Sequence, residues 1–126
     1  MFNVTLDQAS NTLTISYGGF VTPDETRSCS DEVHLALTIL EPGFRLIVDL
    51  TELRAMEMAC SPVIAQIMKM CNAAGVAEVV RIIPDPTRDI GLQIMSFFHY
   101  GPEIRILTCG SAAEAVNVLA AETGEL

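Results

Sequence analysis

The sequence has little positive charge. It contains a single lysine, Lys69, and only seven lysine and arginine residues against sixteen aspartate and glutamate residues, which gives a formal net charge of −9. Nucleic acids and anionic membranes are bound mainly through basic patches, so this balance argues against both as partners. The excess of negative charge also favours solubility, although 50% of the residues are hydrophobic.

Long apolar runs and targeting signals are also missing. No run approaches the roughly 18 apolar residues that indicate a membrane-spanning helix. The first residues, MFNVTLDQ, have neither the basic nor the apolar region of a secretory signal. We therefore expect a cytoplasmic protein. A chain of 126 residues can bury a core of its own, and we expect residues 1–126 to form one domain.

The hydrophobic pattern predicts five strands and four helices. The strands are Phe2–Leu6, Thr12–Tyr17, Arg45–Leu50, Glu78–Ile83 and Glu103–Thr108. The helices begin at Thr22-Pro23, at Ser61-Pro62, at Asp85 or Thr87 (ending near His99) and at Ser111. The first two strands form a hairpin, with the first strand antiparallel to its neighbour. Later strands and helices alternate, so we predict an α/β fold with a mixed, mostly parallel five-stranded sheet and four helices.

The stretch from Arg45 to Asn72 organises the rest of the chain. The strand Arg45–Leu50 is almost continuously apolar, as expected of an interior strand covered on both faces, and we expect Val48→Ala to cost about 2–4 kcal/mol. Pro62 suits the first helical position, and Ser61 before it can cap the helix. The segment between strand and helix is predicted to be a loop.

Asp49 and two methionines are candidates in this stretch. Asp49 lies at the carboxyl end of the strand, the usual place for sites in α/β folds, although a simpler interpretation is that it accepts hydrogen bonds from the following loop. Met56 and Met58 would make the loop a hydrophobic contact patch, or one of them would point into the core.

The four cysteines form no metal-binding pattern. They are widely separated, without a CxxC pair or a nearby histidine, so we expect neither a zinc site nor another metal. Cys71 and Cys109 have apolar neighbours and are predicted to be small buried side chains. Cys60 lies where the loop meets the helix, and the helix dipole there would lower its pKa. No histidine or aspartate partner accompanies Cys60.

Catalytic motifs are absent as well. The sequence contains no GxGxxG, GxxxxGK[ST], HExxH or GxSxG pattern. His34 and His99 have no obvious partner in sequence and are best interpreted as surface or cap residues. We expect no enzyme activity and no cofactor.

Residues 46–67, LIVDLTELRAMEMACSPVIAQI, resemble a segment of STAS domains, the anti-sigma factor antagonists, usually written V-L-D-L-S-x-V-x-x-I-D-S-S-G-L-x-x-L. Upstream, GFVTPDET stands where the family has G-x-L-D-x-x-T. Downstream, SAAEAVNVL fits the closing S-x-x-E-A-L. The resemblance implies a STAS-like fold and a protein partner such as an anti-sigma factor or a serine-kinase-like protein.

The phosphorylation motif of that family is degenerate here. In the family, D-S-S-G carries the serine that a partner kinase phosphorylates, and gapless alignment places that serine on Ala59, which has no hydroxyl. Thr22 stands at the aspartate of G-x-L-D, while Glu57 keeps an acid. Ser61, two positions further on, is a rival phosphorylation site, because a phosphate there would lie at a helix N-terminus.

We therefore predict a non-catalytic protein-interaction module in bacterial signalling and transcription regulation. The expected partner-binding residues are Thr22, Asp49, Glu57, Met58, Ala59, Cys60 and Ser61. The alternative is a small-molecule or lipid-binding STAS-like domain, in which the apolar third helix (IGLQIMSFF, residues 90–98) and the methionines line a pocket. A homodimer formed through exposed apolar surface is also left open.

Overall fold

A computed structural model describes residues 1–83 and 104–123. The strands are β1 (Phe2–Asp7), β2 (Thr12–Tyr17), β3 (Gly19–Val21), β4 (Arg45–Asp49), β5 (Leu53–Met56), β6 (Glu78–Ile82) and β7 (Arg105–Cys109). The α-helices are α1 (Pro23–Leu37), α2 (Ser61–Ala73) and α4 (Ala112–Thr123), and a 3₁₀ helix, η1 (Met58–Cys60), precedes α2.

The main sheet has five strands in the order β1-β2-β4-β6-β7. The β1–β2 pair is antiparallel, as predicted, whereas β2–β4, β4–β6 and β6–β7 are parallel, so the sheet is mixed. Strand β4 has partners on both sides, which confirms its predicted interior position. The described residues contain three α-helices rather than the four predicted, and the predicted third helix, residues 85–99, lies outside them.

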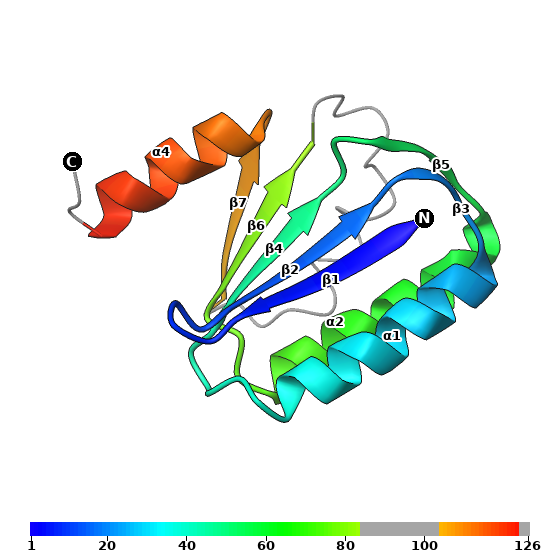
Figure 1. The fold of residues 1–126 in the computed structure, drawn as a ribbon, viewed down its shortest axis with the longest axis horizontal. Helices are drawn as coiled ribbons and strands as arrows, with labels where there is room; N and C mark the ends of the chain where they lie inside the picture. Colours follow the sequence, from blue (N-terminus) through cyan, green and yellow to red (C-terminus); the bar gives the residue numbers. More distant parts are fainter. Residues whose placement is uncertain (84–103, 124–126) are drawn as a thin grey trace.

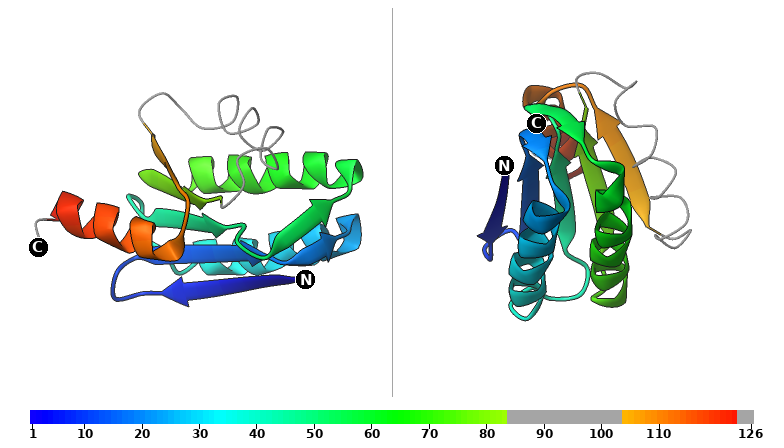
Figure 2. Two further views of the ribbon diagram at one scale, coloured as in Figure 1. Left: turned by 90° about the horizontal axis from the view of Figure 1, so that it is seen from above. Right: turned by 90° about the vertical axis from the view of Figure 1, so that its right-hand side faces the viewer.

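The helices cover the sheet unequally. Helices α1 and α2 lie side by side on one face, with β1 at one edge of the sheet, and α4 lies by β6 and β7 (Figure 1 and Figure 2). Helices α1, α2 and α4, the three in the described ranges, are each too short or too polar to cross a bilayer.

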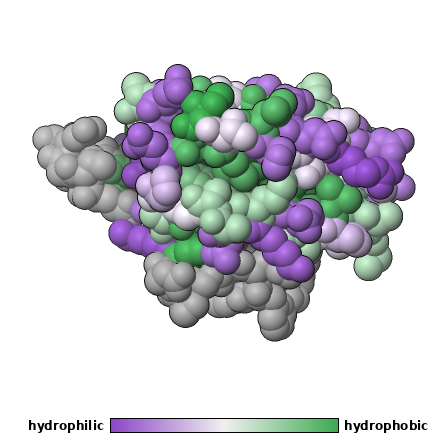
Figure 3. All heavy atoms as spheres, turned by 90° about the horizontal axis from the view of Figure 1, so that it is seen from below, coloured by the Kyte–Doolittle hydropathy of each residue, from purple (hydrophilic) through white to green (hydrophobic). Residues whose placement is uncertain are grey.

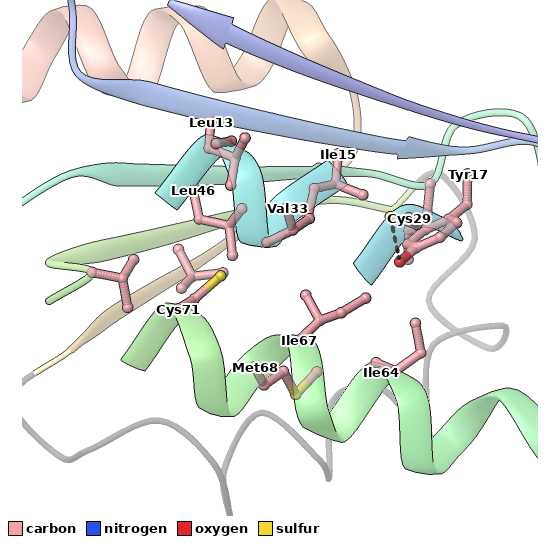
Figure 4. Packing of buried hydrophobic residues seen from close by; sticks show 14 of the residues in the cluster. Leu13, Ile15, Tyr17, Cys29, Val33, Leu46, Ile64, Ile67, Met68 and Cys71 are labelled. Carbon is pink, nitrogen blue, oxygen red and sulfur yellow. Dashed lines mark hydrogen bonds between the residues drawn. The ribbon is translucent and has the colours of Figure 1, made fainter. Parts of the chain in front are cut away.

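The core lies between the sheet and α1 and α2. Side chains of β2 and β4 point toward side chains of both helices in Figure 4, which labels Leu13, Ile15, Tyr17, Cys29, Val33, Leu46, Ile64, Ile67, Met68 and Cys71. The hydroxyl of Tyr17 lies 3.5 Å from the Sγ of Cys29. A smaller cluster on the other face consists of Val80, Ile82, Cys109 and Ala115. Ile47 of β4 packs against this second cluster, and both Ile47 and Asp49 remain half-buried, so β4 has the predicted cover on both faces but only partly on this one.

Helix α1 begins as its sequence predicts. The Thr22 Oγ1 accepts a hydrogen bond from the Glu25 N–H (3.3 Å), and the Glu25 Oε1 accepts one from the Thr22 N–H (3.2 Å). This reciprocal capping box satisfies donors that have no partner within the helix. Pro23 occupies the first turn, where its missing N–H costs nothing.

A compact corner joins the far ends of these helices to the sheet. Gly75 follows α2 with a φ of +94°, and its carbonyl accepts a 2.7 Å hydrogen bond from the Gly43 N–H. A Cβ at Gly75 would lie 3.0 Å from the Cβ of Pro42. The side chain of Asn11 both accepts from the Glu41 N–H and donates to the Glu41 carbonyl, each at 3.0 Å. The β1–β2 hairpin is thereby tied to the chain after α1.

Candidate interaction site

A two-stranded ribbon leaves the main sheet beyond β2 and β4. Its strands, β3 and β5, are parallel and pair Phe20 with Ala55 and Val21 with Met56. Beyond the paired residues, the Glu57 N–H donates to the Val21 carbonyl at 3.2 Å. The prediction that the segment between the strand ending at Leu50 and the helix beginning at Ser61 is a loop is therefore wrong, because β5 and η1 occupy most of it. We call this element the β3–β5 ribbon.

Helix α2 does not begin at a serine cap. The 3₁₀ helix η1 leads directly into α2, and the residue before α2, Cys60, already has helical backbone angles (φ −72°, ψ −23°). No side chain caps α2, and the Ser61 N–H donates to the Met58 carbonyl. The predicted capping role of Ser61 is wrong because η1 supplies the preceding turn. The Ser61 side chain is instead exposed within the first turn.

Cys60 anchors this turn from the inside. Its side chain is fully buried, its thiol donates to the Val21 carbonyl at 3.6 Å, and its N–H donates to the Glu57 carbonyl at 2.9 Å. Burial raises the pKa of the Cys60 thiol, and the negative charge of Glu57 adds to the increase. The predicted lowering of this pKa by the helix dipole is wrong. Cys60 offers no surface to a partner, and it positions the residues around it.

The neighbours of Cys60 face solvent. Glu57, Ala59 and Ser61 are exposed, and Met58 is 89% exposed. Thr22, at the start of α1, is also exposed, and the pairing of β3 with β5 brings it to the same end of the molecule (Figure 1). Of the seven predicted partner-binding residues, the structure thus gathers Thr22 and residues 57–61 in one place.

Phe20 belongs to this region and was not predicted. It is 71% exposed on β3, whereas Val21 beside it is only 1% exposed. Neighbouring strand residues point to opposite faces, so only one of the two can turn inward. In the sequence, the adjacent apolar residues Phe20 and Val21 could have signalled this exposure. If the segment is a strand at the surface, one of these two side chains must face solvent.

Asp49 is separate from the exposed residues around η1. Leu46 of β4 packs toward α1 and α2, so by strand alternation Asp49 lies on the opposite face of the sheet. Its carboxylate accepts hydrogen bonds from the N–H (2.9 Å) and the hydroxyl (2.5 Å) of Thr51. This confirms the simpler interpretation of Asp49. Asp49 also borders a cavity of about 380 Å³, together with Ser16, Tyr17 and Glu52.

The potential metal ligands, the cysteines and His34 form no further candidate site within the described residues. No group of three or more potential metal ligands occurs among residues 1–83 and 104–123. All four cysteines are free and buried, as predicted for Cys71 and Cys109. Burial raises the pKa of Cys29 to about 11 and that of Cys71 to about 12, so both thiols stay protonated at neutral pH. His34 is exposed, and His99 lies outside the described residues.

Comparison with known proteins identifies the fold. No protein-family model matches the chain, and no curated protein matches it in sequence. Solved structures do match. An uncharacterised DUF3478-family protein with a SpoIIAA-like fold, from Shewanella loihica PV-4, has a TM-score of 0.72 and 14% identity, with 94% of this chain and 93% of that chain covered.

Two structures of SpoIIAA match as well, both at 16% identity and with 94% of this chain covered. The phosphorylated form of this Bacillus cell-fate determinant has a TM-score of 0.65 and 99% of its own chain covered. The unphosphorylated form, described as an anti-sigma factor antagonist, has a TM-score of 0.63 and 97% covered. The chain is therefore an α/β protein with a SpoIIAA-like fold. This is the STAS-like fold that the resemblance in sequence implies.

Proposed function

We propose that the protein is a non-catalytic protein-interaction module of bacterial cytoplasmic signalling, similar to the anti-sigma factor antagonists. The observation that carries this proposal is the exposure of Met58 on a turn that the buried Cys60 anchors. Met58 is 89% exposed, yet the residue two positions on, Cys60, is fully buried and bonded to β3. Large apolar side chains held outward on fixed backbone are typical of binding surfaces.

The proposed surface consists of Thr22, Glu57, Met58, Ala59 and Ser61. Cys60 supports it from below. Asp49 is left out, because it lies on the other face of the sheet with its carboxylate bonded to Thr51. The likeness to SpoIIAA, described as an anti-sigma factor antagonist and solved in phosphorylated and unphosphorylated forms, supports a protein partner and a role in transcription regulation.

Phosphorylation of a serine at position 59 cannot control binding, because this chain has Ala59 there, which has no hydroxyl to accept a phosphate. Binding would then be constitutive or regulated at another residue. Ser61 is the rival acceptor, because its side chain is exposed and caps no helix. A phosphate there would lie in the first helical turn, where free N–H groups and the helix dipole favour negative charge.

Binding through Met58 is tested by purifying the natural partner and measuring its affinity for two variants. Met58→Ala should weaken binding about tenfold or more, as removal of a central apolar anchor does. Val116→Ala is the matched control, because Val116 is 65% exposed on α4, away from this surface. Equal affinities for both variants would overturn the proposal.

The phosphorylation state is tested by intact-protein and peptide mass spectrometry on protein from its native host, in rich and stressed growth. We expect no phosphate on residues 57–61. A phosphorylated fraction at Ser61 that disappears in Ser61→Ala, together with altered partner binding, would show that the switch lies at Ser61. Ser28→Ala, at an exposed serine of α1, is the control.

Small-molecule or lipid binding is the second candidate. The cavity beside Asp49, at about 380 Å³, falls in the size range of ligand pockets. The predicted pocket, lined by residues 90–98 and the methionines, falls outside the described part of the chain, and Met58 itself faces solvent. Native mass spectrometry of the purified protein would reveal a retained ligand, and its absence after gentle purification would argue against this function.

A further inference from the structure

Strand β1 forms an edge of the main sheet, and one of its two sides has no neighbouring strand among the described residues. It pairs with β2 alone in the strand order β1-β2-β4-β6-β7. Strand β1 lies at the margin of the sheet, with the other described strands of the sheet all on one side of it (Figure 2). The backbone N–H and C=O groups along such a margin can bind a further strand.

The hydrogen bonds at the start of β1 show which of its backbone groups face this open side. The Met1 amino group donates to the Gly18 carbonyl at 3.0 Å, and the Gly18 N–H donates to the Met1 carbonyl at 2.8 Å. In an antiparallel pair, residues that exchange both bonds alternate with residues whose N–H and C=O point away from the neighbouring strand. The register of β1 on β2 therefore directs the backbone groups of Phe2, Val4 and Leu6 away from β2.

The open side of β1 lacks the features by which edge strands usually prevent further pairing. Such strands carry charged residues or proline, or a β-bulge interrupts them. Residues Phe2–Leu6 contain neither charge nor proline, and their register with β2 is continuous. Asp7 comes only at the end of the strand, and the Met1 amino group is already paired with Glu25. The edge between Met1 and Asp7 is therefore uncharged, although the whole chain has a net charge of −9.

The side chains of β1 are arranged symmetrically about Val4. Phe2, Val4 and Leu6 are apolar and half-buried, and they alternate with the exposed polar residues Asn3 and Thr5. Two copies can pair antiparallel about a twofold axis at Val4. Phe2 of one copy then faces Leu6 of the other. In the same way Asn3 faces Thr5. Apolar side chains thus meet apolar ones, and each outward N–H and C=O obtains a partner, so a second copy of this chain fits the edge.

This pairing would also extend the core. Phe2 and Val4 pack against the cluster between the sheet and helices α1 and α2 but remain partly exposed. Seen from the side of the helices, apolar residues reach the margin of the molecule on which α1 and β1 lie, at the top of Figure 3. Apolar side chains of the two copies would cover each other at this margin, and their burial would stabilise the pair.

We propose that two copies of this chain associate through antiparallel pairing of their β1 strands, which makes the two main sheets continuous. The β1 edge shares no residue with the surface of Thr22 and residues 57–61, so this pairing does not depend on the proposed function. A contact one strand wide covers less than about 1,200 Å², the lower end of standard interfaces, and we expect a dissociation constant of about 10–100 µM. Because each copy has a net charge of −9, association should strengthen as salt screens the repulsion.

Sedimentation equilibrium of the full chain tests this pairing, at protein concentrations from about 10 µM to about 1 mM. We expect a monomer–dimer equilibrium in which the dimer fraction rises from low to moderate salt. Amide hydrogen exchange followed by NMR locates the contact. The outward N–H groups of Phe2, Val4 and Leu6 should become protected as the protein concentration rises. The N–H groups of Asn3 and Thr5, which already face β2, should not change.

Matched variants separate strand pairing from other kinds of association. Val4→Pro removes the central outward N–H but none of the bonds between β1 and β2, so it should raise the dissociation constant about tenfold or more. Thr5→Lys places a lysine of each copy beside the twofold axis, at an exposed position, and should have a similar effect. Asn117→Lys makes the same charge change at an exposed residue of α4, which lies by β6 and β7, and should not weaken association. Circular dichroism shows whether each variant folds, and Thr5→Lys decides the test if Val4→Pro unfolds the chain.

Strand pairing is refuted by a chain that stays monomeric up to about 1 mM, by a dimer that both β1 variants leave intact, or by protection that appears outside β1. A dimer that Thr5→Lys and Asn117→Lys weaken equally would also refute it, because the association would then depend on charge and not on the strand. None of these results bears on the proposed function, since Met58→Ala is measured against the natural partner.

Discussion

Replacement of Leu46 by alanine tests the packing of the sheet against its two helices. Leu46 is 1% exposed on the interior strand β4 and belongs to the cluster between the sheet and helices α1 and α2. Truncation removes apolar atoms from a site whose neighbours are held by two paired strands, so the cavity can close only partly. Such leucine truncations cost about 2.7–5 kcal/mol, and we expect a loss of about 3 kcal/mol in the free energy of unfolding.

Urea denaturation followed by circular dichroism measures this loss. Leu35→Ala is the control, since it removes the same atoms from a side chain that is 66% exposed and should change stability by about 0.5 kcal/mol or less. The urea dependence of unfolding should stay unchanged in both variants. A loss below about 1 kcal/mol for Leu46→Ala would mean that the helices do not pack on β4 as described.

Three further variants test other features of the structure. Val48→Ala should cost about 1 kcal/mol in urea denaturation, below the value predicted from sequence, because Val48 is half-buried. Gly75→Ala should cost about 1–2 kcal/mol, since φ is +94° and the new Cβ would press on Pro42; an unchanged midpoint would contradict this backbone. The raised pKa values of Cys29 and Cys71 mean that these thiols stay protonated in the folded chain, while the unfolded chain ionises from about pH 8.5. The contribution of these thiols to the free energy of unfolding should therefore be fully present below that pH and be lost as the pH rises toward 11–12. The decrease should be less steep in Cys71→Ala. A free energy of unfolding that stays constant from about pH 8 to 11 would refute the burial of these thiols.

The elements with strong periodicity were predictable from sequence. Helix α1 carries its start signal in adjacent residues, Thr22 and Pro23, and its buried stripe at helical spacing. Strand β2 alternates so that Leu13 and Ile15 face inward, and both are at most 2% exposed. These features depend on residues close together in the chain, and local patterns therefore report them.

The candidate site was harder to predict because long-range pairing shapes it. Strand β5 has only four residues, of which Arg54 and Ala55 are exposed, so it shows little of the pattern of a strand. Its structure comes from β3, more than 30 residues away in sequence. The same pairing buries Cys60 and turns Phe20 outward. Sequence alone located Glu57, Met58 and Ala59 through their resemblance to a known motif, but it did not show which neighbours support them.

The interleaving of buried and exposed residues between Leu53 and Ser61 has an evolutionary consequence. Leu53 and Cys60 hold the backbone from inside, while Glu57, Met58 and Ala59 contribute almost nothing to the core. Substitutions at such exposed positions usually change stability by less than about 0.5 kcal/mol. Under the proposed function, a lineage carrying this framework can therefore exchange one partner for another without first acquiring compensating mutations elsewhere. Descendants would diverge fastest at these three positions while retaining the same framework.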